Sequence, residues 1–456
     1  MSGFLGSVWW MIVSLGLLVT FHEFGHYWVA RRFGVKVLRF SVGFGKALWS
    51  RRGRDGTEYV IAALPLGGYV KFLDDSQPDE TRAEVAPAEA AQAFNHQPVW
   101  SRIAIVAAGP LANLLLCVAL LWAMLVIGRP DFAPVLGHVE GIAAQSGLQR
   151  GDTLLAVGGR DTPTWSEAAL ALVTAAMDRA DVPVSVRDSN GVETSRTLRL
   201  SALPTDFDQP RALQAIGLTP RHRLLPAVVG RVQEGLPAWG VLAEGDRITA
   251  IDGTPVQVFE EIGPLLQALG ARGEPGMIEV EREGERLALE LAPARRSPDG
   301  GEAHWALGIA PASTDLPAYD ATLRHGPLDA LPAALRETGK LASDSFAMIR
   351  RMVTGRASVE NLSGPITIAR YANASAGLGV AWFLSFLALL SLSLAIINLL
   401  PIPILDGGHL LYYLIELVKG SPLSERAMVA GQYVGLAMLA GLMGLAFYND
   451  ILQLLR

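Results

Sequence analysis

Apolar residues gather in four long stretches that contain no charged side chain. A helix of about 20 residues is enough to cross the hydrocarbon core of a bilayer. A buried helix in a large soluble core could explain one such stretch, but four in one chain favour membrane spans. The uncharged stretches are residues 1–21, 103–127, 371–405 and 427–449. We therefore predict a multi-span α-helical membrane protein with four transmembrane helices, at 1–30, 101–128, 371–416 and 427–449.

The first stretch could also be a signal peptide that is removed after export. It lacks the positively charged N-terminal region of such peptides and a clear small-residue cleavage site. It also continues directly into a polar motif that begins at His22. We interpret it as a transmembrane helix that stays in the mature protein.

Positive charge is concentrated just after the first stretch. Residues 31–54 carry eight Lys and Arg side chains and no Asp or Glu. Loops rich in Lys and Arg stay on the cytoplasmic side of a membrane. We therefore predict a cytoplasmic loop at 31–100, with both termini and residues 129–370 on the opposite side. The whole chain has a net charge of −6 and no long basic run, so nucleic acid is not expected as a partner.

The segment between the second and third stretches contains an internal repeat. Gly141-Ile-Ala-Ala144 and Gly151-Asp-Thr-Leu-Leu-Ala-Val-Gly-Gly159 are matched, 94 residues later, by Gly235-Leu-Pro-Ala238 and Gly245-Asp-Arg-Ile-Thr-Ala-Ile-Asp-Gly253. A repeat of this length indicates a duplicated domain. The single cysteine, Cys117, cannot form an intrachain disulfide, so neither copy depends on one.

The repeated pattern resembles PDZ domains, in the circularly permuted form found in bacterial proteases. Such domains bind an extended peptide or a C-terminus at the edge of a sheet. We predict two tandem PDZ-like α+β domains, at 129–222 and 223–315, inserted between the second and third spans. An alternative is that both domains are spacers that exclude bulky substrates, because the pattern alone does not reveal a ligand.

A juxtamembrane segment at 316–370 follows the repeat. Within residues 326–352, apolar side chains recur at roughly helical spacing with Arg336, Lys340 and Arg350 between them. The pattern predicts an amphipathic helix, which could rest on the membrane surface. Packing against the duplicated domains is an equally open alternative.

A metal-binding pattern ends the first span. His22-Glu23-Phe24-Gly25-His26 is an H-E-x-x-H motif, which places both imidazoles on one face of a helix. Glu23 can then act as a base that takes a proton from water activated by zinc. A cluster of polar residues that faces the lipid headgroups is the alternative. Such residues at the end of an apolar span are costly unless they line a water-filled cavity or bind a partner.

The third stretch ends in the acid that could complete this site. Asp406 is the only Asp or Glu between Arg370 and Glu416, and the predicted topology places it at the depth of the two histidines. Pro401 and Pro403 precede it and break the helix, which frees backbone groups that only a cavity or protein contact can satisfy. A catalytic zinc needs three protein ligands and an open position.

With these two motifs and the duplicated domain between them, the chain resembles the site-2 protease family of intramembrane zinc proteases over nearly its whole length. The resemblance implies His22, His26 and Asp406 as ligands of one Zn²⁺ per chain and Glu23 as the catalytic base. It implies that Asn398 holds the substrate backbone, with Pro401 and Pro403 beside it. His409 is an alternative ligand, but we expect a packing or hydrogen-bonding role because a fourth protein ligand would close the site.

Two further segments resemble the family. Residues 57–72, with Gly67 and Gly68, are similar to its membrane-reentrant β-hairpin, whose edge could hold an unwound substrate; an ordinary cytoplasmic hairpin is the alternative. Residues 101–113 open the second span with Gly109 and Ala112, small residues that allow close helix packing. We expect Asn113 to pack or to hydrogen-bond there rather than to act in catalysis.

The function that the resemblance implies is zinc-dependent cleavage of single-span membrane proteins, in regulated intramembrane proteolysis. Implied substrates are anti-sigma factors of an envelope stress response and remnant signal peptides. The implied location is the bacterial inner membrane, with the lipid bilayer around the spans and the PDZ-like domains on the periplasmic side. A non-enzymatic PDZ scaffold is the rival from another class. A serine protease is not supported, since no Gly-x-Ser-x-Gly motif occurs.

Overall fold

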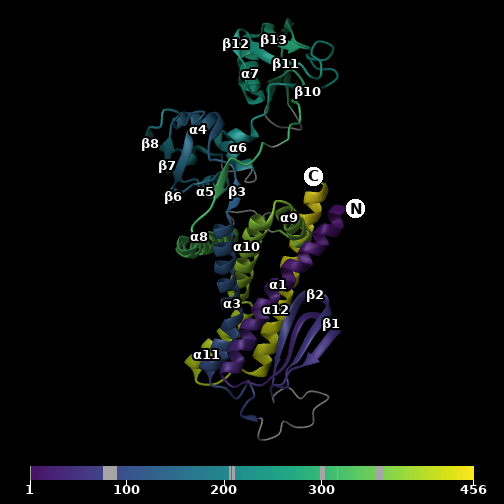
Figure 1. The fold of residues 1–456 in the computed structure, drawn as a ribbon, viewed down its shortest axis with the longest axis vertical. Coiled ribbons are helices and arrows are strands. Elements are labelled where there is room, and N and C mark those ends of the chain that lie inside the picture. Colours follow the sequence, from purple (N-terminus) through teal and green to yellow (C-terminus); the bar gives the residue numbers. More distant parts are fainter. Residues whose placement is uncertain are drawn as a thin grey trace. The chain divides into compact units, whose positions relative to one another are not determined.

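The uncharged stretches form long helices (Figure 1) in the computed structural model, which describes residues 2–74, 90–204, 207, 211–297, 303–315, 317–354 and 363–455. The chain divides into two compact units. The first, here called the membrane unit, consists of residues 1–129 and 324–456, and the second, the inserted unit, of Pro130–Leu323.

The membrane unit is mainly helical, and within it the two chain ends lie at the same end (Figure 1). Among the described residues, four helices are long and apolar enough to cross a membrane: α1, α3, α10 and α12. The helices of this unit are α1 (Ser2–Arg32), α3 (Val99–Ile127), α8 (Pro327–Val353), α9 (Pro365–Gly377), α10 (Val380–Leu399), α11 (Asp406–Lys419) and α12 (Glu425–Leu455).

The predicted third transmembrane helix at 371–416 is divided into parts of three helices. Helix α9 ends at Gly377, and α10 begins after Gly379, whose φ of +112° is accessible mainly to glycine. Helix α10 ends at Leu399, before Pro401 and Pro403, which cannot donate helical hydrogen bonds. The span is therefore α10 alone, and α11 is a separate helix that starts at Asp406.

The predicted hairpin within 57–72 is corrected by the strand pairing. Strand β2 (Glu58–Phe72) pairs with β1 (Val37–Arg52), which the sequence analysis considered only for its charge. Phe40 lies opposite Tyr59 and also opposite Val70, so the first half of β1 lies between the two halves of β2. Strand β1 can turn back at its middle because Gly43 and Gly45 adopt positive φ there. The resulting sheet lies beside α1 (Figure 1).

Small residues bring α1 and α3 into direct contact. A Cβ atom on Gly25 would lie 2.3 Å from the carbonyl oxygen of Ala108 and 2.8 Å from the Cβ of Ala112. Neither distance is tolerable, so only glycine permits this approach. The backbone of α3 is therefore close enough to α1 to contact the side chains of the H-E-x-x-H motif.

Helix α8 packs against α3 within the membrane unit. Its Ala330, Ala334 and Thr338 are buried, and Thr338 Oγ1 lies 3.8 Å from Cys117 Sγ of α3. The indole N–H of Trp122 donates to the carbonyl of Pro327 at 2.9 Å. On the remaining surface of α8, Leu328, Leu331 and Leu335 are exposed, as is typical of an amphipathic helix.

The inserted unit contains two modules with the same strand order, as the repeat predicts. The first has the four-stranded sheet β6-β5-β7-β8 with the pair β4-β9, and the second has β12-β11-β13-β14 with the pair β10-β17. The elements are β3 (Arg129–Asp131), β4 (Leu136–Val139), α4 (Gly141–Gln145), β5 (Thr153–Val157), β6 (Arg160–Asp161), α5 (Trp165–Asp178), β7 (Val182–Arg187), β8 (Glu193–Leu198), η1 (Leu200–Ala202), α6 (Ala212–Ile216), β9 (Leu218–Pro220), η3 (Arg221–Arg223), β10 (Val229–Val232), β11 (Arg247–Ile251), β12 (Thr254–Pro255), η4 (Phe259–Glu261), α7 (Ile262–Arg272), β13 (Gly276–Arg282), β14 (Glu285–Leu291), β15 (Ala294–Arg296), β16 (His304–Ala306), β17 (Ile309–Pro311) and β18 (Ala321–Leu323).

The repeated Gly-Asp pair has the same structural role in both modules. Asp152 and Asp246 are buried, and each carboxylate accepts a hydrogen bond from the backbone N–H three residues earlier, at 2.9 Å from Gln149 and 2.8 Å from Ala243. Each therefore closes the tight turn that leads into the central strand, β5 or β11. Each module also has its own apolar core.

Candidate metal centre

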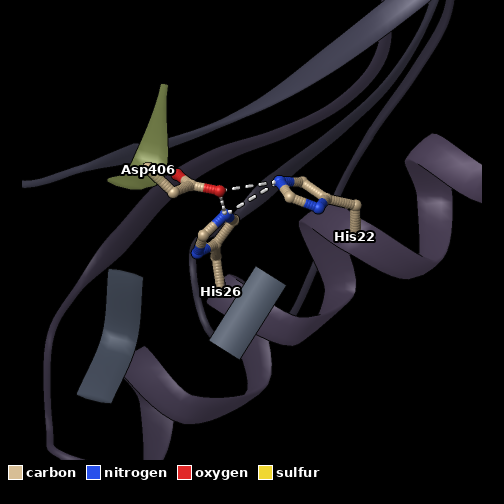
Figure 2. A group of neighbouring side chains, drawn as sticks. All are labelled: His22, His26 and Asp406. Atoms are coloured by element: carbon tan, nitrogen blue, oxygen red, sulfur yellow. Dashed lines mark hydrogen bonds and ion pairs between the residues drawn. The ribbon is translucent and has the colours of Figure 1, made fainter. Parts of the chain in front are cut away.

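The two histidines of the H-E-x-x-H motif face the same direction from α1. His22 and His26 are one helical turn apart, and both are buried. Their Nε2 atoms lie 3.3 Å from one another. Figure 2 shows both rings pointing toward a third side chain, Asp406.

Asp406 reaches this position because it is the first residue of α11. Two glycines follow it and allow the start of α11 to pack against the preceding loop. A Cβ atom on Gly407 would lie 2.2 Å from the carbonyl oxygen of Leu400, and one on Gly408 would lie 2.5 Å from that of Ile402. The Asp-Gly-Gly sequence therefore directs the carboxylate toward α1, across a distance of 380 residues in the chain.

The three side chains converge on one point (Figure 2). Asp406 Oδ2 lies 3.1 Å from Nε2 of His22 and 3.5 Å from Nε2 of His26. One ligand atom from each residue lies within 4.8 Å of the others. Among the described residues, these three form the one cluster of His, Cys, Asp or Glu side chains that could hold a metal ion. His409 is not in this group; its ring packs edge-on against Tyr412, with the ring centres 6.1 Å apart.

Helix α3 orients both histidine rings. Nδ1 of His26 lies 2.8 Å from the carbonyl oxygen of Ile105, which can only accept a hydrogen bond. The proton of a neutral His26 therefore lies on Nδ1, and its Nε2 has a free lone pair. Nδ1 of His22 lies 3.3 Å from Nδ2 of Asn113.

Gly109 of α3 has no side chain, and this leaves space for the two imidazole rings. A Cβ atom on Gly109 would lie 2.2 Å from Nε2 of His26 and 2.9 Å from Cε1 of His22. Gly109 therefore does more than allow helix packing, as the sequence analysis had it: any larger residue would collide with the two imidazoles.

These side chains fit a zinc ion. Two imidazole nitrogens and one carboxylate oxygen are a typical ligand set of catalytic zinc, and they leave a coordination position open. Two ring nitrogens that face one another across 3.3 Å favour a cation between them when both present lone pairs. The close, buried arrangement is thus accounted for by a metal ion better than by direct contact of the three groups alone.

The side chain of Glu23, on α1, contacts the edge of the β1–β2 sheet. Its carboxylate accepts a hydrogen bond from the backbone N–H of Val70 in β2. A Cβ atom on Gly68 would lie 3.0 Å from Cγ of Glu23 and 2.8 Å from Cγ1 of Val19. Gly68 therefore lets the edge of β2 approach the motif, and Gly67 packs on the ring of Phe44.

The other predicted site residues lie on the segment that leads to Asp406. Asn398 is in the last turn of α10 and is partly exposed, as are Pro403 and, to a greater extent, Pro401. Helix α12 contacts the same loop: a Cβ atom on Gly435 would lie 1.7 Å from the carbonyl oxygen of Pro403. This contact was not predicted, although Gly431 and Gly435 form the Gly-x-x-x-Gly pattern that indicates close helix packing.

Comparison with known proteins shows which family the chain belongs to. The family description "Peptidase family M50" matches residues 10–442. The chain belongs to peptidase family M50. It is therefore a zinc metalloprotease of the site-2 protease family.

Individual relatives align along 99–100% of the chain. A Xylella fastidiosa (strain Temecula1) protein that bears the name of a zinc metalloprotease is 56% identical over 452 residues, which cover 99% of this chain and 100% of that protein. The protease RseP of Yersinia pestis is 42% identical over 460 residues, and the regulator of sigma-E protease RseP of Escherichia coli (strain K12) is 41% identical over 464 residues. Both alignments cover 100% of both chains.

Proposed function

We propose that His22, His26 and Asp406 hold one zinc ion per chain and that Glu23 is the catalytic base. The observation that carries this proposal is the convergence of Asp406 Oδ2 with both Nε2 atoms, at 3.1 and 3.5 Å. Zinc bound by these groups would act as a Lewis acid that polarises a peptide carbonyl and makes water nucleophilic.

Glu23 has the surroundings that a general base needs. It precedes the inward-facing His26 by less than one helical turn and is fixed at its carboxylate by the N–H of Val70. From there it can take a proton from the attacking water and pass that proton to the departing amine. The backbone of β2 thus sets the position of the base, and α3 sets the positions of the two imidazoles.

The edge of β2 is the proposed site for the substrate backbone. A transmembrane helix must be unwound before one of its peptide bonds can be attacked, and an exposed strand edge can hold the unwound part by main-chain hydrogen bonds. The segment of β2 that contains Gly68 and Val70 contacts Glu23 directly. Asn398, Pro401, Pro403 and Gly67 would line the remainder of this path.

We propose that the two modules of the inserted unit are PDZ-like domains that select substrates. The second has a cavity of about 610 Å³ between α7 and the strands β16 and β17, lined by apolar residues of α7 and by Arg231 and Arg296. A peptide C-terminus carries a negative charge and suits such a site.

The proposed substrates are single-span membrane proteins such as anti-sigma factors, and remnant signal peptides. The name "regulator of sigma-E protease" that the Escherichia coli relative carries supports this class. The proposed location is the inner membrane, with loop 31–100 and the metal centre toward the cytoplasm and the inserted unit in the periplasm. This orientation rests on the eight Lys and Arg side chains of residues 31–54.

Glu23→Gln tests the mechanism. It keeps the size and polarity of the side chain but removes the base, so cleavage of a single-span substrate by the purified protein should fall by about 10²–10⁴-fold. Zinc content should stay at the wild-type level, as measured by elemental analysis. Cleavage at the wild-type rate would refute the mechanism.

Asp406→Ala separates the protease from a PDZ scaffold. With one of three ligands removed, the variant should lose both zinc and cleavage. A scaffold requires no metal, so a wild-type protein that purifies without zinc and does not cleave when zinc is added would favour that rival.

A further inference from the structure

Asn113 lies where it can control the metal ligand His22. It is fully buried in α3, and its backbone carbonyl accepts a hydrogen bond of 2.7 Å from Ser391 of α10. Its side-chain Nδ2 lies 3.3 Å from Nδ1 of His22. Its Oδ1 is buried and has no hydrogen-bond partner among the described residues.

The chemistry of a metal-binding imidazole decides which amide atom must face the ring. Nε2 of His22 points at Asp406 Oδ2, so Nε2 is the atom that would bind zinc, and it needs its lone pair to do so. The ring proton then lies on Nδ1, which requires a hydrogen-bond acceptor. An amide N–H₂ group cannot accept, whereas Oδ1 can.

A half-turn of the Asn113 carboxamide gives the Nδ1–H of His22 an acceptor and gives Oδ1 of Asn113 a donor. It exchanges Oδ1 and Nδ2 without changing the space that the side chain fills, so hydrogen-bond chemistry decides between the two orientations. After this exchange Oδ1 lies next to the N–H of His22, and the buried oxygen acquires a donor. His26 is held in the same manner by the carbonyl of Ile105, at 2.8 Å. Helix α3 then supplies one acceptor to each histidine.

We propose that Asn113 is a positioning residue for zinc: its side-chain oxygen accepts the Nδ1 proton of His22 and so keeps Nε2 of that ring available to the metal. The proposal rests on the zinc site proposed above. It goes beyond the packing role expected from the sequence, because it assigns the carboxamide a defined effect on metal affinity.

Zinc affinity of the purified, full-length protein measures this role directly. Competition against a chromogenic chelator compares the wild type with three variants. Asn113→Leu has similar volume but no acceptor, and it should weaken zinc binding by about 10–100-fold. Asn113→Asp keeps an acceptor at the same position and should bind zinc as tightly as the wild type or more tightly. Where Leu impairs folding, Asn113→Ala also removes the acceptor.

Ser391→Ala is the matched control. Ser391 is as deeply buried as Asn113. Its hydroxyl donates to the backbone carbonyl of Asn113 and does not contact the Asn113 side chain's partner, His22. It should change thermal stability at most and leave zinc affinity unchanged.

Two outcomes would overturn the proposal. The first is a zinc affinity equal to that of the wild type in Asn113→Leu or Asn113→Ala. The second is an equal loss of zinc affinity in Asn113→Leu and Asn113→Asp, because that result would indicate a packing role. If the wild-type protein itself binds no zinc, the proposed metal centre fails, and that result is distinct from either of these.

Discussion

Gly109 lies on the face of α3 that meets the imidazoles of His22 and His26, and the space above its Cα atom is filled by those rings. A methyl group there would come within 2.2 Å of His26 Nε2, the atom expected to bind zinc. Neither ring can withdraw easily, because His26 is tied to Ile105 and His22 lies against Asn113. At the residue scale, the site depends on where side chains are absent as well as on where they are present.

Gly109→Ala should therefore lose zinc and proteolysis while the spans remain folded. Within a helix, alanine is more favourable than glycine by about 1 kcal/mol, so helix propensity does not explain a loss. Elemental analysis and cleavage assays measure the effect. Gly16→Ala is the control, since no atom lies within 4 Å of its added Cβ, and it should behave as the wild type. Full zinc occupancy in Gly109→Ala would contradict the packing described here.

Helix α11 carries Asp406 at its first residue, so its placement against α3 sets the position of that carboxylate. Near the other end of α11, Glu416 accepts two hydrogen bonds from the Arg102 guanidinium of α3, at 2.7 and 3.2 Å. The same guanidinium lies 4.9 Å from the ring centre of Tyr413. Both charged side chains are mostly buried, and the paired geometry is specific in direction. At the element scale, this ion pair holds α11 to the helix that orients the histidines.

Reversing one charge of this pair should loosen α11. Arg102→Glu and Glu416→Arg each leave two like charges in a mostly buried place, which should lower the free energy of unfolding by about 3 kcal/mol or more and reduce zinc affinity. The double variant restores opposite charges and should recover part of both losses. Thermal unfolding in detergent and chelator competition follow the two effects. Additive losses in the double variant would show that the pair does not couple the helices.

The membrane unit and the inserted unit have separate structural foundations. The cores of both modules consist of residues within Pro130–Leu323. At the scale of the whole molecule, we therefore expect a fragment of residues 130–323 to fold without the spans. Its second module also contains an ion pair, in which the partly exposed Arg282 contacts the buried Asp246 at 2.7 Å. Burial by itself would raise the pKa of Asp246, but hydrogen bonds from Arg282 and the Ala243 N–H outweigh it and lower the pKa below its usual value.

The lowered pKa of Asp246 gives the fragment a defined pH dependence. Because the folded state holds the proton less tightly than the unfolded state, this stabilisation is present above the unfolded pKa and is lost as pH falls through the folded one. Asp246→Asn should lower the free energy of unfolding by about 1–3 kcal/mol at neutral pH and by less below pH ~4. Denaturant titration measures both. Glu244→Gln removes the same charge from an exposed neighbour and should have little effect; a pH-independent loss in Asp246→Asn would refute the linkage.

Local patterns were sufficient wherever the relevant residues are close in the chain. Uncharged stretches predicted the four apolar helices, because burial of backbone groups in lipid allows little else. The offset between Gly151 and Gly245 predicted two modules with one strand order. The spacing of His22 and His26 placed both imidazoles on one face of α1. Each of these inferences depends only on helix geometry, strand alternation or repetition.

Contacts between distant segments were decided by the tertiary structure. No local pattern reveals that the first half of β1 lies between the halves of β2, because pairing depends on which edges meet after the chain bends. The same holds for Gly109 and Asn113, whose effect on the histidines arises only when α3 packs on α1. The sequence by itself determined which residues are suited to bind a metal. Packing decided their distances, since a coordination site needs atoms within a few ångströms and the chain separates Asp406 from His26 by 380 residues.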